Sequence, residues 1–167
     1  FQAVIDIESN ASDTIADRNL AYSKHAYGIA QFKTATAVSP GYNVANIFDT
    51  ATELGITYDS KLKNNAIAQQ KTNARNGNGM KDIEGEAGEE VIRLLQIANI
   101  NLTMSARYLS RLYKKYDGDI AKTLLGYNQG PSVADKWDGN IETIPAKKSE
   151  GVGYLRKADA ILSFLES

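Results

Sequence analysis

Apolar residues recur at helical spacing through the second half of the chain, and this pattern constrains the fold more than any other feature. Recurrence every three to four residues predicts amphipathic helices whose apolar faces pack into a core. No alternating run rivals these stripes, so the sequence predicts a mainly α protein. The four stripes are Val91, Ile92, Leu94, Leu95 and Ala98; Ala106, Leu109, Leu112, Tyr113 and Tyr116; Ile120, Ala121, Leu124 and Leu125; and Leu155, Ala158, Ile161, Leu162 and Leu165.

Turn-forming residues predict where these helices begin and end. Gly118 is expected to end the second helix and Asp119 to cap the third. Gly130-Pro131 must end the third helix, because proline lacks a backbone N–H and clashes with the preceding turn. Upstream, Ser39-Pro40-Gly41 and Gly55 divide the chain into short helical pieces.

The segment between residues 58 and 90 differs in character, being rich in amide, turn-forming and acidic side chains. We interpret it as a polar insertion with its own helix near residues 61–74 and a flexible tip, in a single domain whose core is about residues 1–57 and 91–167. Its acidic residues lack the spacing of a calcium loop, so a solvated surface, with Glu89-Glu90 near a helix N-terminus, is favoured over a metal site. These acidic residues are Asp82, Glu84, Glu86, Glu89 and Glu90.

Composition excludes several classes of function. A chain of 167 residues is long enough to form one domain with its own core. The absence of cysteine excludes disulfides, thiolate metal sites and cysteine nucleophiles. A net charge of −1 gives no electrostatic reason to bind nucleic acid or an anionic membrane. No apolar run reaches the ~20 residues of a membrane span and no signal peptide is present, while the start at Phe1 suggests a piece of a larger polypeptide or assembly.

Two short stretches near the start of the chain carry candidate functional groups. Glu8-Ser9 closes the apolar run 4–7, so a carboxyl lies where a helix leaves the core, which suits a general acid with a raised pKa. A solvated or salt-bridged glutamate is the alternative. Further on, Gly28 before an apolar pair and Gln31 predicts a close backbone approach and then a buried amide. His25, the only histidine, is expected to be a surface residue.

Four motifs, in order along the chain, resemble those of the soluble lytic transglycosylase family. The family commonly reads E-S, G-L-M-Q, A-Y-N-A-G-P and E-T-R-x-Y at these places. Residues 101–137 and 141–145 also resemble the family, whereas Ala30, Lys33, Val152 and the insertion depart from it. The motifs here are Glu8-Ser9, Gly28-Ile29-Ala30-Gln31, Gly126-Tyr127-Asn128-Gln129-Gly130-Pro131 and Glu150-Gly151-Val152-Gly153-Tyr154.

The resemblance implies a lysozyme-like, mainly α domain of the goose-type and transglycosylase class. It implies cleavage of peptidoglycan between N-acetylmuramic acid and N-acetylglucosamine with a 1,6-anhydro product, in the periplasm or facing the cell wall, with no cofactor or metal. Residues 31–37 resemble phage proteins, so carriage in a phage virion is also expected. By motif, Glu8 is the catalytic acid and base, and the substrate-binding residues are Ser9, Ser23, Gln31, Tyr127, Asn128, Glu150 and Tyr154.

The chemistry itself is consistent with a single carboxyl. A hydrolysing glycosidase normally needs two carboxyls about 5 to 9.5 Å apart. Asp6 is expected on another face of the same helix as Glu8, and Asp13 in a loop. A muramyl C6 hydroxyl held beside the anomeric carbon replaces the second carboxyl, and such positioning is worth on the order of 7–11 kcal/mol. Glu8 must then begin neutral, and the candidates for its apolar neighbours are Val4, Ile29 and Tyr127.

Two other readings of the same residues stay open. A hydrolytic lysozyme of goose type would share the fold and the acid but needs a carboxylate, Asp13 or Glu150, to position water. A catalytically idle wall-binding or virion module would need none of these groups. Tyr127 is assigned to the site, with a core aromatic as the alternative.

Overall fold

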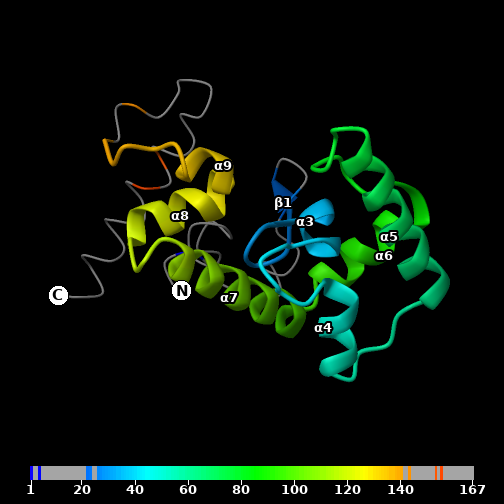
Figure 1. Ribbon diagram of the computed structural model, residues 1–167. Helices are drawn as coiled ribbons and strands as arrows, with labels where there is room; N and C mark the ends of the chain where they lie inside the picture. Colours follow the sequence, from blue (N-terminus) through cyan, green and yellow to red (C-terminus); the bar gives the residue numbers. More distant parts are fainter. Residues whose placement is uncertain are drawn as a thin grey trace. The chain divides into compact units, whose positions relative to one another are not determined.

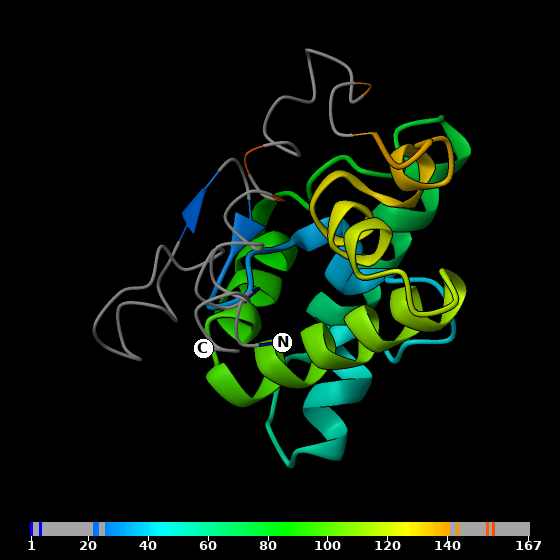
Figure 2. The same ribbon diagram turned by 90° about the vertical axis from the view of Figure 1, so that its left-hand side faces the viewer.

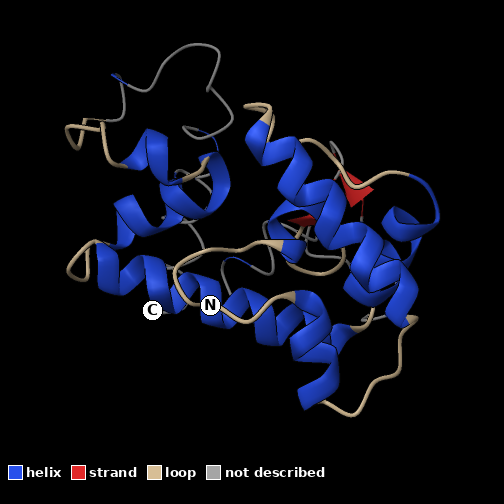
Figure 3. Ribbon diagram, turned by 45° about the vertical axis from the view of Figure 1, so that its right-hand side comes forward, coloured by secondary structure: helices blue, strands red, loops and turns tan. Residues whose placement is uncertain are grey.

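Helices dominate the part of the chain that the computed structural model describes, which is residues 1, 4, 22–23, 26–140, 143, 153 and 155 (Figure 1). The mainly α class predicted from the sequence is therefore confirmed (Figure 3). The strands are β1 (Tyr22–Ser23), β2 (Ala26–Tyr27) and β3 (Phe32–Lys33). The helices are α3 (Thr34–Val38), α4 (Ile47–Glu53), α5 (Ser60–Arg75), α6 (Gly85–Leu95), α7 (Ala98–Lys115), α8 (Ile120–Gln129) and α9 (Pro131–Ala134).

The contacts within the chain divide it into two compact units. Residues 8–107 form one, here called the central unit, and residues 1–7 with 108–167 form the other, the terminal unit. Helix α7 contributes residues to both. The interpretation of residues 1–167 as one domain with an insertion stays a prediction. Within the described ranges, every helix falls short of the length and apolarity that a membrane span requires.

A small antiparallel sheet opens the described part of the central unit. Its strand order is β1-β2-β3, with Tyr27 paired to Tyr22 on one side and to Phe32 on the other. Each strand has only two residues, too few for an alternating pattern to be visible in the sequence. The sheet's importance lies in the turn between β2 and β3, residues 28–31, which carries one of the predicted motifs.

Short helices pack behind this turn and form the core of the central unit. Helix α3 contacts α4, α5 and α6, so its buried face is shared by three neighbours. The breaks at Ser39-Pro40-Gly41 and Gly55 are confirmed, since α3 ends at Val38 and α4 at Glu53. The fully buried large side chains of this unit are Phe48, Ile47, Leu94, Leu95, Ile100, Met104, Val91, Asn101 and Thr34.

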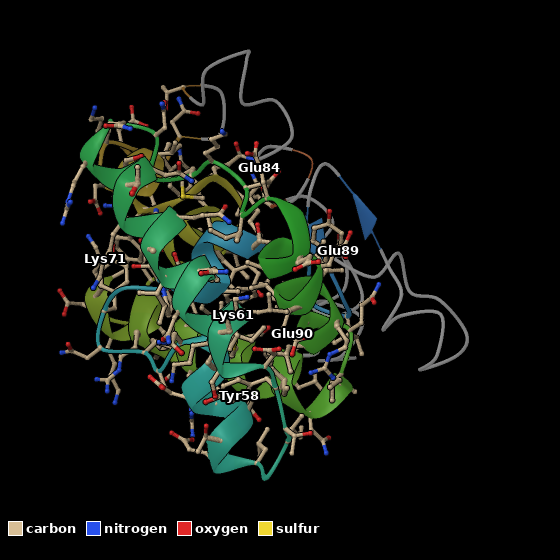
Figure 4. The ribbon with its side chains drawn as sticks, turned by 90° about the vertical axis from the view of Figure 1, so that its right-hand side faces the viewer. Tyr58, Lys61, Lys71, Glu84, Glu89 and Glu90 are labelled. Carbon is tan, nitrogen blue, oxygen red and sulfur yellow. The ribbon has the colours of Figure 1, made fainter. Side chains whose placement is uncertain are left out.

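The polar segment between residues 58 and 90 contains the helix predicted there. Helix α5 begins after Asp59, whose side chain accepts hydrogen bonds from the backbone N–H of Lys61 (2.7 Å) and Leu62 (3.2 Å). Figure 4 shows α5 beside α6, with which it packs. The prediction that Glu89 and Glu90 lie near a helix N-terminus was wrong, because α6 begins earlier, at Gly85.

The boundaries of α8, in the terminal unit, follow the predicted turn residues. Gly118 has φ +85°, and the Asp119 side chain caps α8 by accepting a 2.9 Å hydrogen bond from the N–H of Lys122. Gly130, with φ +90°, ends α8, and Pro131 opens α9 at its first position. Helices α8 and α9 consequently pack side by side (Figure 2).

The core of the terminal unit combines residues from both ends of the chain with residues of α8 and α9. Three core positions predicted from the stripes are wrong: Ile120 is 54% exposed, Tyr113 is 49% exposed, and Ala106, on the same helix as Tyr113, is exposed as well. Ile120 occupies the first position of α8, and Tyr113 lies against Gly118 at the surface turn. Of the fourth stripe, Leu155 is buried as predicted and the rest lies outside the described residues. The buried cluster is Val4, Leu124, Leu125, Ala134 and Leu155, flanked by Leu109, Tyr116, Tyr127, Val133 and Trp137.

Candidate active site

Some of the predicted site residues lie within the described part of the chain and others do not. Gln31, Tyr127 and Asn128 are described with their side chains, and Ser23 is described as a backbone position in β1. The predicted catalytic residue and three predicted substrate-binding residues, Glu8, Ser9, Glu150 and Tyr154, lie outside the described residues, as do Asp6, Asp13, His25 and Val152. Their assignments stay predictions.

The motif at residues 28–31 forms a tight four-residue turn between β2 and β3. The backbone N–H of Gln31 donates to the Gly28 carbonyl at 3.0 Å, and the Gln31 side-chain Nε2 donates to the same oxygen at 2.9 Å. Gly28 and Gln31 both have positive φ, +78° and +51°. Two bonds to one carbonyl thus hold the Gln31 side chain against its own turn.

Gly28 is required by a close approach of two backbone segments. A Cβ atom at this position would lie 2.2 Å from the carbonyl oxygen of Leu95 and 2.3 Å from Nδ2 of Asn101, far inside any permitted contact. The turn therefore presses against the end of α6 and the start of α7. This confirms the close backbone approach predicted from the glycine in the sequence.

Asn101, which the sequence analysis did not single out, anchors the turn. Its side chain is fully buried. Nδ2 donates to the carbonyls of Tyr27 (3.1 Å) and Leu95 (2.9 Å), and Oδ1 accepts from the N–H of Ala30 at 3.0 Å. The signal available in the sequence was a polar pair, Asn101 and Ser105, at i and i+4 on a helix whose neighbouring positions are apolar.

The two polar atoms of the Gln31 side-chain amide differ in their hydrogen bonding. Its Nε2 is bonded to Gly28, whereas its Oε1 is buried and accepts no hydrogen bond from any described residue. Leaving a buried carbonyl without a donor costs roughly 1–3 kcal/mol. Such a group suits a binding site, because a ligand O–H or N–H would recover that cost. The buried amide predicted at Gln31 is therefore confirmed for its oxygen, whereas the residue as a whole is half-buried.

Tyr127 and Asn128 lie in the last turn of α8, in the terminal unit. The Tyr127 ring is half-buried against the terminal core and meets the ring of Tyr108 at a centroid distance of 5.8 Å and an angle of 52°. Oδ1 of Asn128 accepts a hydrogen bond from Nε2 of Gln129. Tyr127 is therefore in part a packing residue, as the alternative reading of the sequence had it.

Close packing also fixes the start of this motif at Gly126. A Cβ atom there would lie 3.0 Å from Cε2 of Tyr116 and 3.5 Å from Cβ of Ala134. The Tyr116 hydroxyl donates to Asp135 at 3.1 Å, and Lys115 Nζ bonds to the same carboxylate at 2.5 Å. The bond from Lys115 lowers the pKa of Asp135, with a smaller contribution from Tyr116. These contacts tie α9 to the end of α7 and so fix the helix that carries Tyr127.

The positions that depart from the motif pattern have opposite environments. Ala30 is completely buried in the turn, where its N–H is held by Asn101. Lys33 is exposed at the end of β3 and precedes the first residue of α3. Among the described residues, no group of three or more His, Cys, Asp or Glu side chains is arranged to hold a metal ion.

Comparison with known protein families gives one match. A family model described as Transglycosylase SLT domain matches residues 75–149, a segment that contains Asn101, Tyr127 and Asn128. The match begins within the segment interpreted as an insertion, and the turn at residues 28–31 precedes it. Comparison with curated proteins and with solved structures finds no match.

Proposed function

We propose that this chain is a peptidoglycan lytic transglycosylase, because residues 75–149 match the model of the transglycosylase SLT domain family. This match, with the mainly helical fold, bears out the family resemblance and the lysozyme-like fold class predicted from the sequence. The proposed reaction cleaves the β-1,4 bond between N-acetylmuramic acid and N-acetylglucosamine and forms a 1,6-anhydro-muramyl product. The protein then acts on the side of the envelope that faces the cell wall.

In the proposed mechanism Glu8 acts first as an acid and then as a base. The neutral carboxyl gives its proton to the leaving oxygen as the glycosidic bond breaks. The muramyl C6 hydroxyl then bonds to the anomeric carbon, and Glu8 takes the C6 proton and returns to its neutral state. No water is consumed, and the sugar's own hydroxyl replaces the second carboxyl of a hydrolytic glycosidase.

The open acceptor at Gln31 is the observation that carries the proposal. Its buried Oε1 has no donor among the described residues, and its Nε2 donates one hydrogen bond to the Gly28 carbonyl. Sugar hydroxyls, the acetamido N–H of either sugar and a protonated carboxyl are all such donors. A protonated carboxyl bonded to an amide oxygen is stabilised in its neutral form, which is the form that a general acid needs.

The remaining substrate-binding assignments rest on motif position and side-chain chemistry. We propose that Tyr127 and Asn128 bind sugar at the end of α8, where a half-buried aromatic ring lies beside an amide. Ser9, Ser23, Glu150 and Tyr154 complete the proposed set of substrate-binding residues.

The test is the product released from purified sacculi, analysed by mass spectrometry. The parent protein is expected to release muropeptides with anhydro ends, each one water lighter than the hydrolytic product. Glu8→Gln should lose at least a thousandfold in rate while retaining the fold and glycan binding, because an amide cannot supply the proton. Glu89→Gln, which changes an exposed glutamate on α6, is the matched control and should act like the parent.

The other outcomes of this experiment would contradict the proposal in different ways. Reducing ends in the products would show hydrolysis, and so a lysozyme of goose type. Binding to sacculi without release would show a wall-binding module. Turnover by Glu8→Gln close to the parent rate would remove Glu8 from the mechanism.

A further inference from the structure

Asn101 is a fully satisfied amide that connects three backbone segments. It lies on α7, yet its partners are the carbonyl of Tyr27 in β2, the N–H of Ala30 in the turn and the carbonyl of Leu95 at the end of α6. Ser105 Oγ adds a contact to its Oδ1 at 3.4 Å. Both N–H groups and the oxygen of a buried side chain are therefore used.

Only an amide of this length satisfies the three backbone groups together. An aspartate keeps the acceptor for Ala30 but loses the donors to Tyr27 and Leu95, and an alanine leaves all three groups unpaired in a dry interior. The two turn contacts bracket Gly28 and Ile29, so they fix the turn from both ends. The backbone of Gln31 follows directly from the bonded N–H of Ala30.

The backbone conformation of Gln31 is uncommon for a residue that has a side chain. Its φ of +51° lies in the left-handed region, which costs roughly 1–2 kcal/mol for a residue with a Cβ atom. Its Nε2 bond to the Gly28 carbonyl exists only while the turn keeps its shape. The direction of the open Oε1 therefore depends on the turn, and the turn depends on Asn101.

We infer that Asn101 is a positioning residue for the active site, which holds the 28–31 turn so that Oε1 of Gln31 stays in place as a hydrogen-bond acceptor for the peptidoglycan substrate. This inference rests on the proposed function. Asn101 itself is enclosed by protein and touches no substrate. Its effect on the reaction passes through Gln31.

A double-mutant cycle between Asn101 and Gln31 tests this role. Asn101→Asp and Gln31→Ala should each lower the rate of anhydro-muropeptide release at least tenfold, and the double variant should be no slower than Gln31→Ala alone. If Asn101 only stabilised the fold, Asn101→Asp would instead lower the rate by the same factor in the parent and in Gln31→Ala. Phe48→Leu, a buried change in α4, is the control for lowered stability and should keep the parent rate below its melting temperature.

The outcomes separate this inference from the proposed function. A folded Asn101→Asp variant within twofold of the parent rate, or additive losses in the cycle, would overturn the positioning role. So would failure of both Asn101→Asp and Asn101→Ser to fold, which would make the residue purely structural. If the parent releases no muropeptide, the proposed function fails alone. The inference is then decided by NMR: the Gln31 side-chain amide signals must shift in Asn101→Asp and not in Phe48→Leu.

Discussion

Gly28 shows how one residue without a side chain fixes a whole motif. Its carbonyl receives two hydrogen bonds from Gln31, and its α-carbon lies so close to Leu95 that even a methyl group has no space. The positive φ alone would favour glycine, but the short distance requires it. These two effects can be separated by experiment, because other glycines of the chain have the same φ without the crowding.

We predict that Gly28→Ala lowers the free energy of unfolding by more than about 3 kcal/mol, through steric overlap added to the left-handed φ. Gly41→Ala is the matched control, since Gly41 has φ +72° and a Cβ atom added there would have no neighbour within 4 Å. It should cost only about 1 kcal/mol, the cost of the backbone conformation alone. Urea unfolding monitored by circular dichroism measures both. Equal losses in the two variants would show that the turn does not press against α6.

At the scale of elements, both members of an ion pair within α6 form hydrogen bonds to the backbone of the segment before α5. Arg93 donates to Glu90 from Nε and Nη2, both at 2.8 Å, and Nη2 also donates to the Thr57 carbonyl at 3.0 Å. Glu90 Oε1 further accepts from the N–H of Asp59 at 3.2 Å. In Figure 4 Glu90 lies on the side of α6 near the start of α5, whereas Glu89 lies away from it. The loop is thus held by a charge-assisted network.

The same network predicts a pH dependence of stability. The hydrogen bonds from Arg93 lower the pKa of Glu90 below its ordinary value of 4.5, with burial opposing and the Asp59 N–H assisting. Because the pKa of Glu90 is lower in the folded protein than in the unfolded protein, its ionised carboxylate stabilises the fold at every pH above the pKa of the unfolded state. This stabilisation is lost as the pH falls through the pKa of the folded state. Glu90→Gln should therefore be less stable than the parent by on the order of 1 kcal/mol at pH 7, since half-exposed Arg93 is screened by solvent.

The difference in stability between Glu90→Gln and the parent should shrink as the pH falls below 4.5, because the Glu90 carboxylate of the parent is then protonated. Thermal unfolding measured above and below this pH tests the prediction. Glu89→Gln, at the exposed neighbouring position, should stay within about 0.5 kcal/mol of the parent throughout. A difference for Glu90→Gln that is constant with pH would exclude the ion pair as its cause.

Helix boundaries could be predicted from the sequence because their causes are local. Asp119, Gly130 and Pro131 act within four residues of themselves, so α8 ends where these residues require. Asn101 could not be recognised in this way, since its partners Ala30 and Tyr27 are 71 and 74 positions away. The sequence predicted a close backbone approach at Gly28 and a buried amide at Gln31, but it did not predict that Asn101 holds the turn.

At the scale of the whole molecule, each unit has its own buried side chains and is stabilised by its own core. In the terminal unit the fully buried Leu125 belongs to the buried cluster that contains residues of α8 and α9. Tyr127 packs against the same cluster. The stability of that motif therefore depends on apolar packing within the terminal unit, as well as on its turn residues.

We predict that Leu125→Ala lowers the free energy of unfolding by about 2–5 kcal/mol, through lost burial and a residual cavity. Ile120→Ala, on the same helix but 54% exposed, should cost less than about 1 kcal/mol. Chemical denaturation compares the two variants, provided that the dependence of the unfolding free energy on denaturant concentration is the same for both. A small loss for Leu125→Ala would mean that the cluster does not support α8.

The carbonyl of Gly28 accepts two hydrogen bonds from Gln31, and this arrangement determines which groups can bind to the Gln31 side chain. One N–H of Nε2 donates to the Gly28 carbonyl, and the buried atom of this side chain that has no partner among the described residues is the acceptor Oε1. Ether oxygens of a pyranose ring and ionised carboxylates are repelled there, whereas hydroxyls and acetamido nitrogens are attracted. Under the proposed function, this acceptor therefore favours a glycan orientation that places a hydroxyl or an acetamido N–H at Gln31, and it does so without a charged side chain.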